Sequence, residues 1–169
     1  MSVELFIAVF ENSEEQAQVA LERIRELSKG GSLKLQNAAV IVKDSDDNVT
    51  VQDIYDVDAK HGAVFGAISG AVVGLLGGPI GAIVGAAAGA AAGGTTAKLA
   101  DYGVSEDMIK GVKDSMPTGS SAIIAYVELA WVDKAIRRLE EAGAVVTHQT
   151  LGGGRIGGWE SGPSTSRQD

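Results

Sequence analysis

One stretch of the chain, residues 61–97, limits the possible folds more than any other, because it contains no Asp, Glu, Lys or Arg. Residues i and i+4 lie above one another on a helix, so glycines that recur every four residues predict a glycine face. Glycine costs about 1 kcal/mol relative to alanine inside a helix, so its regular use indicates close contact with another backbone. Two such sets occur here: Gly62, Gly66, Gly70 and Gly74, then Gly81, Gly85, Gly89 and Gly93.

A turn separates the two glycine sets. It reads Gly77-Gly78-Pro79, and proline suits the first position of a new helix. We therefore predict two helices, 62–76 and 79–100, that fold back on each other as a glycine-zipper hairpin. The eight glycines of the two sets are the residues that we expect to form the self-association and helix-packing surface.

Composition excludes several classes of function. The chain has 169 residues, enough for one domain with a core, and a net charge of -8, which argues against binding to nucleic-acid backbones. It contains no cysteine, which excludes disulfides, thiolate catalysis and cysteine-ligated metals. The first residues carry no basic region ahead of a short apolar run, so no secretory signal is expected and we predict a cytoplasmic location.

The residues on both sides of the glycine segment alternate between strand and helix patterns. Apolar runs predict strands at 3–10, 33–43, 49–55, 121–129 and 144–151, and apolar periodicity predicts helices from Ser13 to Gly30, over 105–116 and over 131–142. Without the hairpin and the short helix after it, we predict the ferredoxin-like βαββαβ order, an α+β sandwich with a four-stranded antiparallel sheet and two helices on one face. The other face must then be solvated, paired or covered. Residues 1–151 form one domain, interrupted by the hairpin at 57–100, and 152–169 form a flexible Gly/Ser-rich tail.

The glycine run, followed by LADYGVSEDMIKGVKDSMPTGSSAIIAYVE, resembles the bacterial domain-of-unknown-function family 1269. The resemblance extends from about Leu5 to Leu151, and its specific parts are the zipper, Asp101-Tyr102-Gly103-Val104 and the turn from Pro117 to Ser121. Members of that family are catalogued as predicted membrane proteins with glycine-zipper segments. The resemblance implies no enzymatic activity and no catalytic residues.

No group of residues in the sequence predicts a reaction, a metal or a cofactor. His61 and His148 are far apart in the chain, and the acidic turn 44–48 lacks the central glycine and the bidentate glutamate of a calcium loop. The tail contains a Gly-x-Gly-x-x-Gly pattern at 152–157, but no helix follows that could bind a pyrophosphate. Trp159 is a lone aromatic in the tail, which we would expect to be buried if the tail docks on a neighbouring subunit.

Three functions are compatible with these patterns. An apolar hairpin needs a partner in water, so our first hypothesis is a non-enzymatic homo-oligomeric scaffold, a ring, shell or filament, with the hairpins in its buried interior. The second is a membrane-associated protein that inserts the hairpin into lipid, although a helix over 62–76 would reach only about 22 Å of the bilayer core of about 30 Å. The third is a domain that binds a small ligand on the open sheet face, by analogy with the fold alone.

Overall fold

The computed structural model describes residues 3–56, 65–66, 69–70, 72–74, 76–77 and 104–150. Its frame is a five-stranded sheet in which all hydrogen-bonded neighbours are antiparallel, in the order β3-β2-β4-β1-β5. The strands are β1 (Val3–Phe10), β2 (Leu35–Lys43), β3 (Val49–Asp56), β4 (Ser120–Glu128) and β5 (Val145–Thr150). All five predicted strands are therefore confirmed, within two residues at each end.

The predicted four-stranded sheet is wrong, because the β2–β3 hairpin adds a fifth strand at one edge. β2 lies between β3 and β4 and is antiparallel to both, so β3 and β4 run in the same direction. A tight turn cannot join two parallel strands, and the chain must cross back between them. The glycine-rich segment and α5 (Glu106–Ser115) belong to this crossover.

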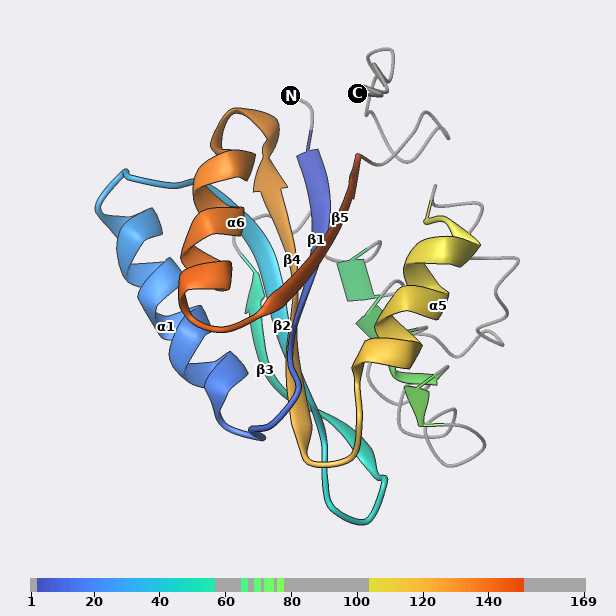
Figure 1. The fold of residues 1–169 in the computed structure, drawn as a ribbon. Helices are drawn as coiled ribbons and strands as arrows, with labels where there is room; N and C mark the ends of the chain where they lie inside the picture. Colours follow the sequence, from blue (N-terminus) through green and yellow to red (C-terminus); the bar gives the residue numbers. More distant parts are fainter. Residues whose placement is uncertain are drawn as a thin grey trace.

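Two helices cover one face of the sheet, as predicted (Figure 1). They are α1 (Gln16–Lys29) and α6 (Val132–Glu141), and a short 3-10 turn, η1 (Leu129–Trp131), leads into α6. Every second residue of a strand points to the same face, which is why alternate residues of β1 and β4 meet these helices. The cluster includes Phe6, Ala8, Val40, Ile123, Ala125, Leu21, Ile24, Ala135 and Leu139.

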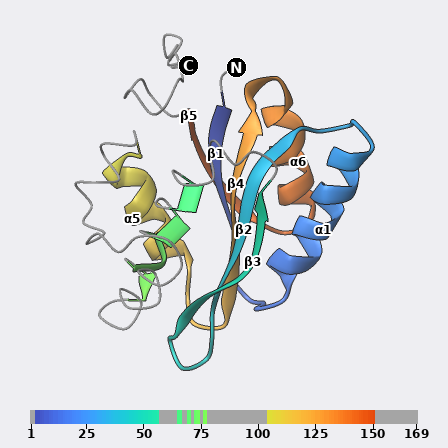
Figure 2. The ribbon, with the colours of Figure 1, turned by 180° about the vertical axis from the view of Figure 1, so that it is seen from behind.

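The opposite face of the sheet is covered as well, by α5 and by described residues of the glycine-rich segment (Figures 1 and 2). Of the three possibilities left for this face, solvated, paired or covered, the structure shows the third. One apolar cluster joins the three parts: Leu5, Ile7, Ile41, Ile124 and Tyr126 from the sheet, Met108 and Val112 from α5 with Met116 directly after it, and Phe65, Val72 and Val73 from the segment.

Serine side chains satisfy the backbone at the start of two helices. Ser13 Oγ accepts a hydrogen bond from the backbone N–H of Gln16 at 3.1 Å, and Ser105 caps α5 by accepting from Met108 N. The predicted cap at Ser105 is confirmed, whereas the predicted N-cap at Ser13 is wrong, because α1 begins two residues later and its N-cap is Glu15. The Gln16 side chain does not complete a capping box, because it donates instead to the carbonyl oxygen of Ala142 at the end of α6.

A β-bulge in β3 turns part of that strand towards α1. Val40 pairs with Asp53 and Ile41 with Val51, so Gln52 has no residue opposite it. An extra residue of this kind moves the following side chains to the other face. Asp53 consequently meets α1, where its carboxylate lies 2.8 Å from Arg25 Nη1 and accepts a hydrogen bond from Gln18 at 3.0 Å.

Candidate functional site

The described part of the predicted glycine hairpin is helical. Residues 65–66, 69–70, 72–74 and 76 all have helical conformation, and the N–H of Gly77 donates to the carbonyl oxygen of Val73 at 2.9 Å. Ser69 lies in this helix and donates its hydroxyl to the carbonyl oxygen of Phe65, also at 2.9 Å. Of the eight predicted packing glycines, Gly66, Gly70 and Gly74 are among these residues. Gly62, Gly81, Gly85, Gly89 and Gly93, with the predicted second helix, lie outside the described residues.

One stripe of this helix is buried against the molecule's own sheet. Phe65 is 2 % exposed and Val73 is fully buried, and positions 65, 69, 72, 73 and 76 share one side of a helix by their spacing. The ring of Phe65 meets the ring of Tyr126, on the central strand β4, in an edge-to-face contact. Large apolar side chains therefore anchor the described residues of the segment to its own domain.

Gly66, Gly70 and Gly74 follow Phe65, Ser69 and Val73 by one position, which places them on an adjacent stripe. Gly70 is buried, and Gly66 and Gly74 are half-buried. A Cβ atom added at Gly66 would meet no heavy atom of the described residues within 4 Å, apart from its chain neighbours and the helix's own backbone. Contacts within the described part of the chain thus give no reason for glycine at position 66.

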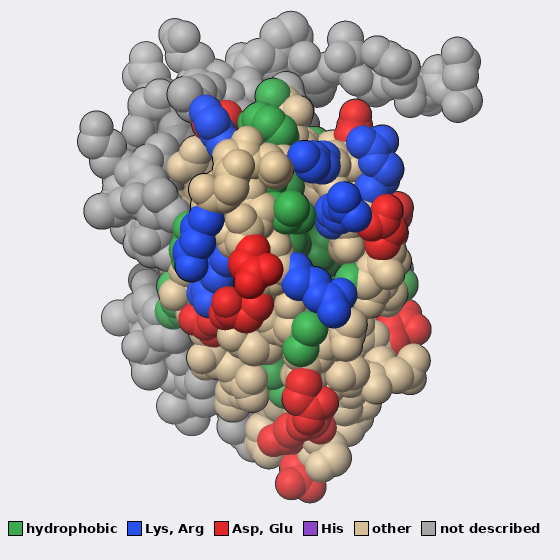
Figure 3. Space-filling view, turned by 90° about the vertical axis from the view of Figure 1, so that its left-hand side faces the viewer, with side chains coloured by type: hydrophobic (Ala, Val, Ile, Leu, Met, Phe, Trp, Pro, Cys, Tyr) green, Lys and Arg blue, Asp and Glu red, His purple; other side chains and the backbone are tan. Residues whose placement is uncertain are grey.

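A groove lies between α1 and α6, on the face of the sheet opposite to α5 (Figure 3). Its volume is about 510 Å³. Arg23 and Glu26 of α1 and Arg138 and Glu141 of α6 line it with both signs of charge. Its apolar lining consists of Ala20, Ile24, Leu27, Leu139 and Ala142. Sequence reasoning missed the groove, because the helical periodicity identifies these apolar positions without giving the separation of the two helices.

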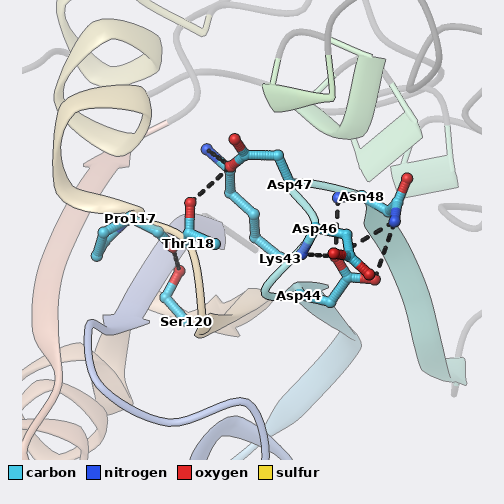
Figure 4. Close-up of polar contacts among 8 residues, drawn as sticks. All are labelled: Lys43, Asp44, Asp46, Asp47, Asn48, Pro117, Thr118 and Ser120. Carbon is cyan, nitrogen blue, oxygen red and sulfur yellow. Dashed lines mark hydrogen bonds and ion pairs between the residues drawn. The ribbon is translucent and has the colours of Figure 1, made fainter.

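In the acidic turn of the β2–β3 hairpin, the Asp44 carboxylate accepts hydrogen bonds from other residues of the same turn (Figure 4). Asp44 Oδ1 accepts from the backbone N–H groups of Asp46 at 2.8 Å and Asn48 at 2.9 Å, and the Asn48 amide donates to both Asp44 oxygens. The hydrogen bonds from Asn48, first from its backbone and then from its side chain, lower the pKa of Asp44. This is the hydrogen bonding of a turn that an aspartate closes.

The same turn is also tied to the loop before β4. Asp47 Oδ1 accepts a hydrogen bond from Thr118 Oγ1 at 2.6 Å and lies 3.3 Å from Lys43 Nζ, and these two partners lower the pKa of Asp47. The Ser120 hydroxyl donates to the carbonyl oxygen of Pro117 within that loop. Among the residues that the structure describes, no three His, Asp or Glu side chains gather in a way that could hold a metal ion.

Of the two histidines, only His148 is described, and His61 lies outside the described residues. His148, on β5, is paired with Glu4, on β1, with 3.3 Å between Nδ1 and Oε1. Its ring also lies 5.9 Å from the ring of Phe6. No pattern in the sequence links Glu4 to His148; strand register brings them together, because Phe6, two residues after Glu4, is directly opposite His148.

The geometry defines a class of protein: an α+β domain whose single sheet is covered on both faces, on one of them in part by a glycine-rich crossover segment. The family described as protein of unknown function (DUF1269) matches residues 63–155, from the glycine-rich segment through α5, β4, α6 and β5. The match covers more than half of the chain, and the protein belongs to this family. No curated protein and no solved structure matches the chain. No helix within the described ranges is both long enough and apolar enough to cross a bilayer.

Proposed function

We propose that the protein is a non-enzymatic homo-oligomeric scaffold, in which the glycine-rich segments of several copies pack together in a buried interior. One observation supports this most directly. The described helical residues between 65 and 76 are anchored to their own sheet through Phe65, Val72 and Val73, whereas a Cβ atom at Gly66 would meet no other described residue. Glycine is costly at such a position, so a contact made by another copy explains why it is present.

The fold suits a scaffold protein, because its sheet can accommodate a long insertion between two strands. With β3 set aside, the order β2-β4-β1-β5 with α1 and α6 corresponds to the ferredoxin-like arrangement that we infer as the underlying unit. The glycine segment enters this unit between β3 and β4. The loop-closure entropy rises only slowly with loop length, so the sheet tolerates an insertion of this size.

Replacement of Gly66 by leucine tests the proposal. The Cβ of the new side chain meets no other described residue, so we expect the domain to fold, while the leucine side chain keeps a second backbone away. We expect the particle mass to fall, measured by light scattering of protein purified without detergent. Gly111→Leu is the matched control, because Gly111 is also helical and equally open, but lies outside the two glycine sets. An unchanged mass for Gly66→Leu would reject the glycine segment as the interface, and recovery of the wild type only in the membrane fraction would favour lipid as its partner.

A second candidate function, the binding of a small ligand, is favoured by the groove between α1 and α6. Its volume of about 510 Å³ is in the usual range of ligand pockets, about 300–1,000 Å³. We place the ligand there and not on the sheet, because α5 and the described glycine-segment residues cover the remaining face. A ligand screen by thermal shift, repeated with Ala20→Trp to fill the groove, tests this alternative. Shifts that persist in Ala20→Trp would exclude the groove.

A further inference from the structure

The two edges of the sheet differ in how they are protected from other strands. A free edge presents a row of backbone N–H and C=O groups, and proteins usually blunt it with charges, bulges or proline. The β3 edge has such features: a bulge at Gln52, and the acidic residues Asp53 and Asp56. The β3 edge is therefore poorly suited to pair with another strand.

The β5 edge has none of these features. β5 reads VVTHQT, with no Asp, Glu, Lys, Arg or Pro, and its pairing with β1 has no register shift. Val145, at its start, is a large apolar residue that is 49 % exposed. β5 is the last strand of the sheet, and no described helix or strand lies in front of it in Figure 1.

We propose that β5 is an interface at which two copies of this chain pair edge to edge through their β5 strands, forming one continuous sheet. A second copy is the fitting partner because β5 can pair antiparallel with itself. The strand has no Asp, Glu, Lys or Arg, so no two such side chains would face each other across the contact. The inference does not rest on the glycine interface, because β5 and the segment are different surfaces.

Symmetry fixes which residues would meet in such a pair. Two identical antiparallel strands are related by a two-fold axis perpendicular to the sheet, so each residue faces one on the same side of the sheet. A residue near the middle of β5 must then face its own counterpart. Thr147 and His148 are the two central residues, and Thr147 shares the α5 side of the sheet with Ile7, which is directly opposite it on β1.

Single cysteines provide a sharp test, because the chain contains none. Cα atoms of directly opposite residues lie about 4.5–5.5 Å apart, a distance that a disulfide can bridge. After mild oxidation of dilute protein, we expect Thr147→Cys or His148→Cys to form several-fold more covalent dimer on a non-reducing gel than Ile54→Cys. Ile54 lies on β3 and is 58 % exposed, so Ile54→Cys controls for random collision. Equal dimer in the control, or none in either β5 variant, would overturn the proposal.

Two further variants separate this interface from the glycine contact. Thr147→Glu would bring two like charges together across the pair, and we expect it to lower the particle mass while circular dichroism stays that of the folded protein. Cross-linking at β5 should persist in the Gly66→Leu background. If Gly66→Leu leaves the particle mass unchanged but β5 still cross-links, the proposed glycine interface is rejected and the proposed β5 interface is retained. If cross-linking at β5 is lost in the Gly66→Leu background, the proposal of an independent β5 interface is overturned.

Discussion

The aromatic rings of Phe65 and Tyr126 meet edge to face, with ring centroids 5.0 Å apart and planes inclined at 74°. Phe65 belongs to the charge-free segment and Tyr126 to β4, which is the central strand of the sheet. Edge-to-face pairs contribute about 0.5–1.5 kcal/mol beyond the area that they bury. This contact therefore anchors the glycine-rich segment to the central strand of the sheet.

Phe65→Ala should destabilise the fold by about 3–5 kcal/mol, since it removes a buried ring and leaves a cavity against Tyr126. The measurement is the free energy of unfolding in urea. Phe65→Leu keeps most of the volume and should lose less than half as much. A loss below about 1 kcal/mol for Phe65→Ala would show that the segment is not held by this side chain.

Ser121→Ala should lower the free energy of unfolding by about 1–3 kcal/mol, because it removes a buried hydroxyl that serves two backbone groups. Ser121 Oγ accepts from the N–H of Ala17 at 3.1 Å and donates to the carbonyl oxygen of Ser13 at 2.6 Å. Ser115→Ala is the control, because that hydroxyl bonds only within its own exposed helix turn in the described structure. Equal losses in the two variants would contradict the role given to Ser121.

Acid should weaken the fold partly through Asp53. Hydrogen bonds from Arg25 and then Gln18 lower the pKa of Asp53 in the folded protein. A lowered folded-state pKa gives a stabilisation that is complete above the unfolded-state value, near about 3.9, and is lost as pH falls through the folded-state pKa. Asp53→Asn should therefore be less stable than the wild type at neutral pH, and its stability should decline less steeply below about pH 4.

Urea unfolding at a series of pH values measures this effect. Arg25→Met should have a smaller effect in the Asp53→Asn background than in the wild type, because the Arg25–Asp53 ion pair at 2.8 Å is already lost there, while the contacts of Arg25 with Glu22 and Tyr55 remain to be lost in both. Parallel pH curves for the wild type and Asp53→Asn would contradict the prediction.

Two glycines should respond to alanine with opposite signs. Gly143 follows α6 with a φ of +91°, a conformation that alanine adopts only with strain, so Gly143→Ala should destabilise the fold by about 1 kcal/mol. Gly111 lies inside α5 with open space around it, so Gly111→Ala should stabilise the fold by about 0.5–1 kcal/mol. Thermal unfolding of the two variants measures both effects, and shifts of the same sign would contradict the assignment.

Local patterns in the sequence were enough to predict the elements and their ends. The Ser105 cap, the stop at Gly143 and the alternating strand residues depend on neighbours in the chain, and each is confirmed within about two residues. Resemblance also predicted the family, from the glycine run and the residues after it.

The arrangement of the strands could not be predicted in the same way. Nothing local in β4 indicates that it lies between β1 and β2, since that position depends on contacts with strands far away in the chain. The same holds for the second sheet face: Phe65 and Val73 were treated as part of an apolar hairpin, and only the fold shows that they lie against β4 and its neighbours. The packing role of all eight glycines stays a prediction.

The central position of β4 has a consequence for the newborn chain. β1 and β2 both pair with β4 and not with each other, so a nascent chain that ends before residue 120 holds a lone strand and a separate hairpin. Translation supplies about 5–20 residues per second, so these pieces wait for several seconds until β4 is made. The full sheet can therefore form only after β4 has been synthesised. Chaperones would be needed in the interval before that.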